Sequence, residues 1–271
     1  TGKLAGIAAV SETDDILLIT TDGTIIRTPV SGIPFYGRSA GGVIVMRLAE
    51  GSSIVNFAKV ENEDETEAAA NAAVWGAFCN AGQNCASVER LYAHESIADE
   101  LIRRIVEKTR ELKLGPGTDP TVSVGPMSSE RQISTVENHV AAFREAGATI
   151  LTGGKRGKSP HDSKGEIEGD GLFYAPTIIS GATNDMRPMQ EETFGPTLPI
   201  CTFKADEEAI ALANDTEFGL ASYFYTRDLA RAWRVAEGLE YGIVGLNTGL
   251  ISTEVAPFGG VKESGTGREG S

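Results

Sequence analysis

Two of the three cysteines in the chain lie on either side of a short loop that could carry out chemistry. The segment FCNAGQNCAS covers residues 78–87, with Cys79 near its start and Cys85 near its end. A cysteine that ends a glycine-containing loop can act as a nucleophile, because a substrate can approach it closely and backbone N–H groups can face a developing oxyanion. The alternative is that Cys85 is a small buried hydrophobic residue, as lone cysteines often are.

The remaining side chains with ligand or redox chemistry form no pattern. No CxxC pair occurs, and His94, His139 and His161 are scattered, so the sequence predicts no metal site. We expect the three histidines at the surface and Cys201 in the interior. Three cysteines are too few for a disulfide scaffold, which favours a reducing cytoplasm as the location.

Composition limits the classes of function. The chain has 271 residues, 41% of them hydrophobic and 23% charged, which is typical of a globular protein with a substantial core. The net charge of −14 argues against charge-driven binding to nucleic acid or to an anionic membrane. No apolar run is as long as a membrane span, and the first residues lack a signal-peptide pattern. The chain does not begin with Met, so it could be a fragment or a processed form.

The elements that must position the loop follow two different patterns. Residues 1–60 indicate strands at 4–10, 16–28, 41–48 and 53–60, the second being a hairpin with its turn at Asp22-Gly23. Five acidic residues then occur within residues 61–67, which we interpret as a solvated linker.

From residue 66 onward the pattern alternates between helices and strands. Helices are expected at 66–78, at 96–115 with Ser96 as N-cap, and at 128–147. Later segments continue the alternation, which indicates an α/β fold: a mainly parallel sheet with flanking helices, preceded by a small antiparallel β segment. We therefore place domains at residues 1–65 and 66–271.

Three motifs of the second domain resemble the NAD(P)-dependent aldehyde dehydrogenases. The pattern FxNAGQxC at 78–85 resembles the active-site segment of that family, and QEETFGPTLPI at 190–200 resembles its cofactor-contact motif. Residues 240–271 resemble the C-terminal part of the family, with the succinate-semialdehyde dehydrogenase branch as the nearest match. The motifs occur in the family's order and cover about residues 70–271.

The resemblance implies a role for each matched residue. Cys85 would attack the aldehyde to give a thiohemiacetal and, after hydride transfer to the nicotinamide of NAD or NADP, a thioester. Glu192 would hold the nicotinamide ribose, and Phe194 would pack near the nicotinamide. Ser252 would help to bind a substrate carboxylate, and Phe258 would line the substrate tunnel. A small aldehyde would be the substrate, and the family implies a homo-oligomer.

Simpler roles remain open for some of these residues. Glu192 could be a solvated acid beside a turn, and Ser252 could be an ordinary loop serine. Cys79 stands where the semialdehyde branch typically has Arg, and a thiol cannot make the paired hydrogen bonds of a guanidinium with a carboxylate. The resemblance therefore does not fix succinate semialdehyde as the substrate.

The first domain resembles a different family. Residues 14–65 carry LLITTDGTIIRT, GRSAGGVIVMRL and EGSSIVNFAKV in order, which resembles the C-terminal domain of the DNA gyrase A subunit. In that family such units form blades of a β-pinwheel with a basic, DNA-wrapping rim. Arg27 and Arg38 are the candidates for DNA contact, or are ordinary surface arginines. The first 67 residues hold five basic against ten acidic side chains, so we expect no DNA binding.

Together the two resemblances predict a chimera joined near residues 66–71, either a natural fusion or an artificial join. No GxGxxG-like or ELGGK-like segment precedes Cys85. The printed chain therefore lacks the nucleotide-binding domain and general base that the family implies, and we expect negligible turnover by it alone. The alternative function is a DNA-binding gyrase fragment with an α/β passenger.

Overall fold

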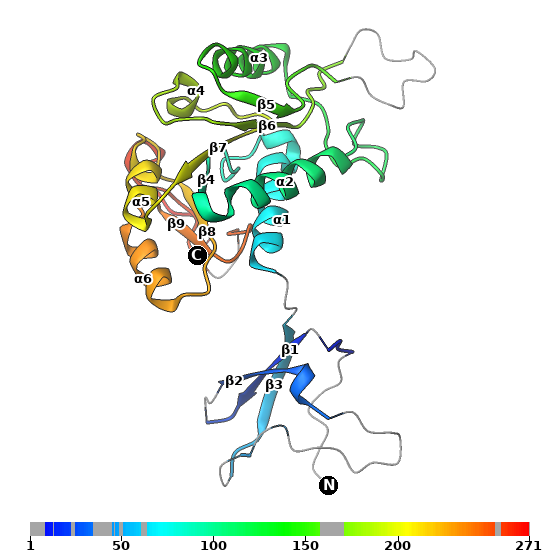
Figure 1. Cartoon of the computed structure of the whole chain (residues 1–271), viewed down its shortest axis with the longest axis vertical. Helices are drawn as coiled ribbons and strands as arrows, with labels where there is room; N and C mark the ends of the chain where they lie inside the picture. The colour runs from blue at the N-terminus through cyan, green and yellow to red at the C-terminus, as the bar shows by residue number, and fades with distance from the viewer. Residues whose placement is uncertain are drawn as a thin grey trace. The chain divides into compact units, whose positions relative to one another are not determined.

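The chain divides into two compact units, residues Thr1–Asp64 and Glu65–Ser271. The computed structural model describes residues 9–12, 14–22, 25–34, 45, 47–48, 51–60, 64–157, 171–252 and 256–270. Figure 1 shows the elements of each unit.

The first unit contains a small antiparallel sheet, as expected. Its strands are β1 (Asp15–Thr20), β2 (Ile25–Pro29) and β3 (Ile54–Val60), in the order β2-β1-β3. Both neighbours pair with β1 in antiparallel register. The short helix η1 (Val30–Gly32) follows β2. Most of segments 4–10 and 41–48 lies outside the described residues, and their described residues are not in strands.

The second unit is an α/β structure. Its strands are β4 (Leu91–His94), β5 (Thr149–Thr152), β6 (Thr177–Ser180), β7 (Thr197–Phe203), β8 (Ala221–Phe224) and β9 (Ile243–Leu246). Its helices are α1 (Glu65–Phe78), α2 (Glu95–Glu111), α3 (Glu130–Glu145), α4 (Arg187–Gln190), α5 (Asp206–Asn214) and α6 (Leu229–Gly238), with the short helices η2 (Cys79–Gly82) and η3 (Lys262–Ser264).

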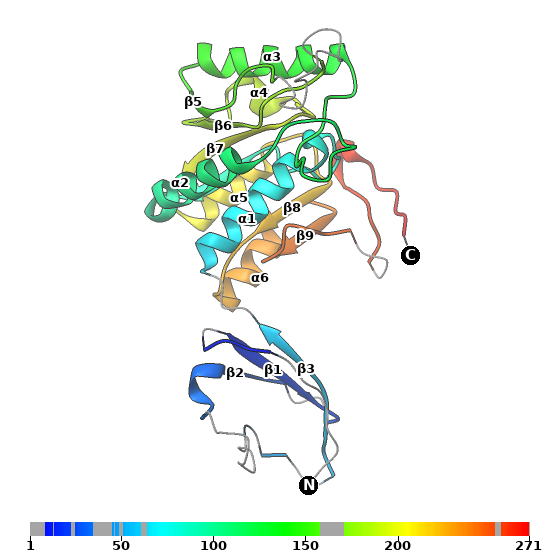
Figure 2. The same cartoon turned by 90° about the vertical axis from the view of Figure 1, so that its right-hand side faces the viewer.

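The sheets of this unit are mainly parallel, which confirms the predicted fold class. The order of the larger sheet is β4-β7-β6-β5. Its β4–β7 and β7–β6 pairs are parallel, and only the edge strand β5 is antiparallel. The strands β8 and β9 form a separate parallel pair, which lies with α6 below the larger sheet in Figure 2.

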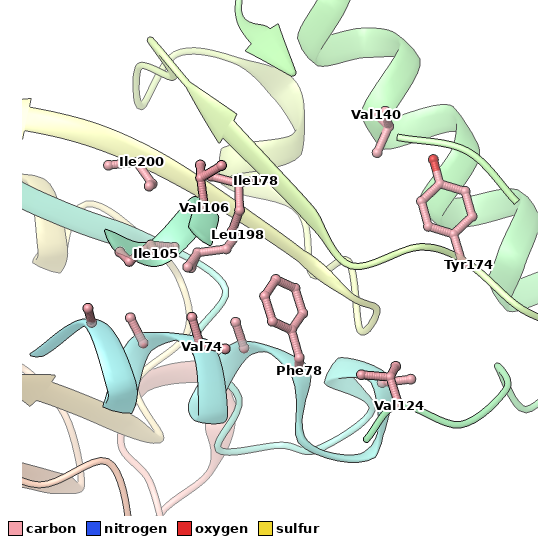
Figure 3. Packing of buried hydrophobic residues seen from close by; sticks show 14 of the residues in the cluster. Val74, Phe78, Ile105, Val106, Val124, Val140, Tyr174, Ile178, Leu198 and Ile200 are labelled. Atoms are coloured by element: carbon pink, nitrogen blue, oxygen red, sulfur yellow. The ribbon is translucent and has the colours of Figure 1, made fainter. Parts of the chain in front are cut away.

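Alternation along the central strands divides the core between the two faces of the sheet. Ile178, Leu198 and Ile200 are fully buried with residues of α1 and α2, whereas Ile179 and Cys201 are buried with residues that include Phe143 of α3 and Met189 of α4. Successive side chains of a strand point to opposite faces, which explains this division. In Figure 3 the ring of Phe78 points from the end of α1 towards Ile178 and Leu198. The end of α1 is thus anchored where the cysteine loop begins.

The acidic run is only partly a linker. Glu65 and Glu67 lie in the first turn of α1, where negative charge is favourable beside the helix N-terminus. The Glu67 carboxylate pairs with Lys108 and, at 3.0 Å, with Arg104, both on α2. These ion pairs lower the pKa of Glu67, and they correct the prediction of a wholly solvated segment.

Helix α2 has its N-cap two residues earlier than predicted. Its N-cap is His94 rather than Ser96, and the His94 side chain accepts a hydrogen bond from the Ser96 backbone N–H. Strand β4 ends at His94, so the chain turns directly from strand into helix. Helix α3 is capped by Ser129, whose side chain accepts from the backbone N–H of Gln132.

No helix in the described part of the chain is long and apolar enough to cross a membrane.

Candidate active site

The loop before Cys85 has an unusual backbone. Asn80, Ala81 and Gly82 have φ values of 53°, 57° and 71°, a left-handed run that costs free energy for Ala and is tolerated by Asn and Gly. A Cβ atom at position 82 would lie 2.2 Å from the carbonyl oxygen of Gly195. The backbone of the cysteine loop therefore lies directly against the segment that carries the second motif.

Gln83 holds this loop in place. Its Nε2 donates to the carbonyl oxygens of Asn80 (3.1 Å) and Pro126 (3.3 Å), and its Oε1 accepts from the Ser128 N–H at 2.7 Å. Asn80 Nδ2 in turn donates to the Gln83 carbonyl oxygen at 3.0 Å. These bonds offset the strain of the left-handed run, as functional loops require.

Cys85 is exposed at the end of this loop, so it is not the small buried residue of the alternative interpretation. It lies in a turn in which the Ser87 N–H donates to the Asn84 carbonyl oxygen at 2.9 Å. Among the described residues, no hydrogen bond uses the backbone N–H of Cys85. Both the thiol and this N–H are therefore available to a carbonyl group.

Tyr223 of β8 lies beside the cysteine turn. Its hydroxyl donates to the Ala86 carbonyl oxygen at 3.0 Å. Burial raises the pKa of Tyr223 to about 12, and the nearby Cys85 adds to the shift. The hydroxyl is therefore a neutral donor at physiological pH, which fixes the residue after Cys85. Cys201, by contrast, is 4% exposed as predicted, and burial raises the pKa of its thiol to about 11.

The second motif follows α4 as an extended turn. Glu192 is exposed and Phe194 is half-buried, and the φ of Phe194 is +49°, a conformation that is strained for an aromatic residue. The buried Thr193 lies between them. The side chains of Glu192 and Phe194, on either side of Thr193, are therefore accessible to solvent.

Glu89, four residues after Cys85, binds the backbone of the second motif, a role that the sequence does not predict. Its Oε2 accepts from the Thr193 N–H at 2.9 Å, and its Oε1 accepts from the Phe194 N–H at 2.7 Å. Burial raises the pKa of the Glu89 carboxyl to about 7, although both hydrogen bonds act in the opposite direction. The sequence VERL offers no signal for this role, because nothing in it marks the half-buried Glu89 as a side chain that binds a distant backbone.

The prediction that His139 lies at the surface is wrong. It is 4% exposed rather than at the surface, and its ring nitrogens lie 2.9 Å from Thr193 Oγ1 and 3.0 Å from Glu191 Oε2. Burial lowers the pKa of His139, against the effect of Glu191. Helical spacing accounts for this burial, since His139 lies three residues after Val136 on the buried stripe of α3.

The other predicted residues are placed less directly. Ser252 is exposed and Phe258 is half-buried. Phe258 exchanges two backbone hydrogen bonds with Glu269, at 2.8 and 2.9 Å. Among the described residues, no hydrogen bond joins Ser252 or Phe258 to the Cys85 loop, so their roles remain predictions.

The loop that leads to Ser252 lies on α1. A Cβ atom at Gly249 would lie 3.0 Å from Ala72 Cβ, and Ala72 belongs to the helix that ends at the cysteine loop. Arg27 lies in β2 opposite Leu17, but its side chain and all of Arg38 lie outside the described residues. All three cysteines are free, and the described residues contain no cluster of three or more potential metal-binding side chains.

Two family matches agree with the motifs. Residues 45–271 match the aldehyde dehydrogenase family, and residues 14–61 match the C-terminal β-propeller domain of DNA gyrase. The two matches overlap at residues 45–61. The aldehyde dehydrogenase match thus begins upstream of the expected junction near 66–71.

Named relatives show the same similarity to the aldehyde dehydrogenases. Over 212 residues the chain is 44% identical to the NADP-dependent succinate-semialdehyde dehydrogenase of Escherichia coli strain K12, covering 78% of this chain and 42% of that protein. It is 42% identical over 268 residues to 3-sulfolactaldehyde dehydrogenase of Pseudomonas putida, covering 94% of this chain and 53% of that protein. The chain therefore spans about half the length of these relatives or less.

Solved structures agree with this result. The crystal structure of succinate-semialdehyde dehydrogenase from Burkholderia pseudomallei has a TM-score of 0.71 and 46% identity, covering 78% of this chain and 42% of that one. A betaine aldehyde dehydrogenase from Staphylococcus aureus, in complex with NAD+ and with a BME-modified cysteine, has a TM-score of 0.70 and 36% identity, covering 76% and 41%. Motifs, fold and relatives lead to one conclusion: the chain belongs to the aldehyde dehydrogenase family.

Proposed function

We propose that this chain carries the thiol half of an NAD(P)-dependent oxidation of an aldehyde to its carboxylic acid, with Cys85 as nucleophile. The observation that carries the proposal is the exposed Cys85, held at the end of a left-handed loop that packs on the segment of Glu192 and Phe194. The relatives named above support both the reaction and the two cofactors.

The Cys85 thiolate adds to the aldehyde carbon, and the oxyanion that forms accepts from the free N–H of Cys85. NAD(P), when bound, supplies the hydride acceptor that converts this adduct into a thioester on Cys85. Water then releases the acid and restores the thiol. The exposed Glu192 carboxylate fits the hydroxyls of a ribose, and the half-buried ring of Phe194 fits the face of a nicotinamide.

The proposed substrate class is a small semialdehyde. Several relatives act on aldehydes whose far end is acidic, as their names succinate-semialdehyde, glutarate-semialdehyde and 3-sulfolactaldehyde dehydrogenase indicate. Ser252 is the candidate for binding that acidic end, and Phe258 for lining the approach. Cys79, where the branch typically has Arg, leaves the choice among these aldehydes to experiment. A homo-oligomer, which the family resemblance implies, and a cytoplasmic location, which the low number of cysteines favours, complete the proposal.

We further propose negligible turnover for the 271 residues alone. Thioester hydrolysis needs a positioned general base, and no segment of this sequence resembles the family segment that supplies it. Purified chain would be given NAD+ or NADP+ with succinate or glutarate semialdehyde. No sustained NAD(P)H formation is expected, and steady production would contradict this part of the proposal. In the same sample iodoacetamide should label Cys85 well before Cys201; equal labelling rates would argue against an accessible nucleophile.

DNA binding by the first unit is the second candidate function, favoured by the gyrase match at residues 14–61.

A further inference from the structure

The peptide groups of Thr193 and Phe194 are bound on every polar atom by side chains from elsewhere. Glu89 accepts from both N–H groups at 2.9 and 2.7 Å. Gln132 of α3 donates Nε2 to both carbonyl oxygens, at 2.7 and 3.2 Å. His139 binds the Thr193 hydroxyl at 2.9 Å. Side chains from two separate segments, Glu89 and helix α3, therefore determine the conformation of these two residues.

We call these hydrogen bonds from Glu89, Gln132 and His139 the clamp. The backbone conformation of Phe194 explains why the clamp is needed. Its φ of +49° is costly for a residue with a Cβ atom, and strained residues persist only where their surroundings over-determine them. The two N–H groups also point at one carboxylate. A carboxylate has two acceptor oxygens for them, whereas an amide would offer one acceptor and one donor.

We propose that Glu89 is a positioning residue, whose charged carboxylate holds Thr193 and Phe194 so that Glu192 and Phe194 face the cofactor side of the Cys85 site. The cofactor part of this inference rests on the proposed function. The clamp itself is a property of the described hydrogen bonds and can be tested without any turnover.

Protonation of Glu89 should weaken the clamp, and this makes the clamp measurable as a function of pH. Burial raises the pKa of Glu89 to about 7, so the carboxylate takes up a proton within an accessible pH range. Glu192 raises this pKa and Arg90 lowers it, while the guanidinium of Arg90 is bound to Ala213 and Tyr241. His139 faces the same segment from α3 through Thr193. A protonated carboxyl keeps one strong acceptor, so one of the two N–H bonds weakens.

Amide hydrogen exchange at Thr193 and Phe194, corrected for the intrinsic pH dependence of exchange, tests the clamp. At pH 8 we expect at least one of the two amides to exchange about 10-fold faster in Glu89→Gln than in wild type, since one hydrogen bond is lost. Wild-type protection should fall towards that of the Gln variant as the pH falls from 8 to 6. Glu145→Gln, which changes an exposed acid of α3, should match wild type throughout.

Two results would overturn the inference: equal protection in wild type and Glu89→Gln at pH 8, or wild-type protection that does not change between pH 8 and 6. If Glu89→Gln fails to fold by circular dichroism, the wild-type titration alone decides. Saturating NAD+ added to wild type separates the two proposals. Slower exchange over residues 191–196 supports the cofactor role, and no NAD+ effect beside an intact pH response overturns that role while the clamp stands.

Discussion

The accessibility of Cys85 depends on how firmly its turn is fixed, and the Tyr223 hydroxyl bond to the Ala86 carbonyl is the nearest constraint. Tyr223→Phe removes that bond and should cost about 1 kcal/mol in the free energy of unfolding. It should also change the iodoacetamide rate of Cys85 several-fold. Tyr241→Phe serves as a comparison, since it removes bonds made away from this turn: its own 2.6 Å bond to Ala213 and the 3.0 Å bond that it accepts from Arg90. Equal effects of both variants on Cys85 would show that Tyr223 does not act on the turn.

Glu89 should make stability depend on pH with a definite sign. Its folded-state pKa of about 7 lies above its ordinary value of 4.5, so the folded chain binds more protons than the unfolded chain between these values. Its contribution is full below pH 4.5 and is lost as the pH rises through 7. From pH 5 to 8, wild type should lose on the order of 3 kcal/mol of unfolding free energy relative to Glu89→Gln, as measured by urea denaturation. A constant difference would contradict the raised pKa.

The residues of this site differ in how far the sequence reveals them. Cys85, Glu192 and Phe194 lie in contiguous motifs, and their loops could be located from the chain alone. Glu89 and His139 matter only through contacts between segments about 50 to 100 residues apart, and no local pattern encodes such contacts. For His139 the helical spacing did carry a signal, since a polar residue on the apolar stripe of a helix needs buried partners.

The conformation of the loop that presents Cys85 depends on Gly82. Gly82→Ala would add a Cβ atom 2.2 Å from the Gly195 oxygen at a φ of +71°, so we expect a loss of about 3 kcal/mol or more in stability. Gly181→Ala tests the backbone term alone, because its φ is +72° and no atom lies within 4 Å. That variant should lose only about 1 kcal/mol. Comparable losses in urea denaturation would show that the close approach of the two loops does not exist.

Among the elements, helices were easier to predict than strands. Helices α2, α3 and α6 have amphipathic spacing and polar or glycine ends, which define them within a few residues. Strand β7 lies at the centre of the sheet but contains Pro199, which argues against a central strand. Its continuous apolar run is typical of a strand buried on both faces, a pattern that spacing alone cannot distinguish from a buried helix.

For the whole chain, the two units bear different relations to known families. The gyrase match ends at residue 61, and the boundary between the compact units falls after Asp64. The aldehyde dehydrogenase match nevertheless starts at residue 45. A chimera remains a proposal, since sequence comparison assigns residues 45–61 to both families.

The negative charge of the chain argues against DNA binding by the first unit. The whole chain carries a net charge of −14, and non-specific DNA binding requires neutralisation of phosphates by basic side chains. We expect no gel shift of duplex DNA at physiological salt. A shift that weakens steeply as salt increases would favour the gyrase-like function instead.

The central claim is that the Cys85 sulfur is an accessible nucleophile with oxyanion support. Acylation by p-nitrophenyl acetate tests it most directly, because attack on an activated ester needs neither cofactor nor general base. Peptide mass spectrometry should locate the acetyl group on Cys85 in wild type and in Cys201→Ser, with release of nitrophenol, and should find none at that position in Cys85→Ser. Acetylation confined to lysines, or equal nitrophenol release by wild type and Cys85→Ser, would contradict the account.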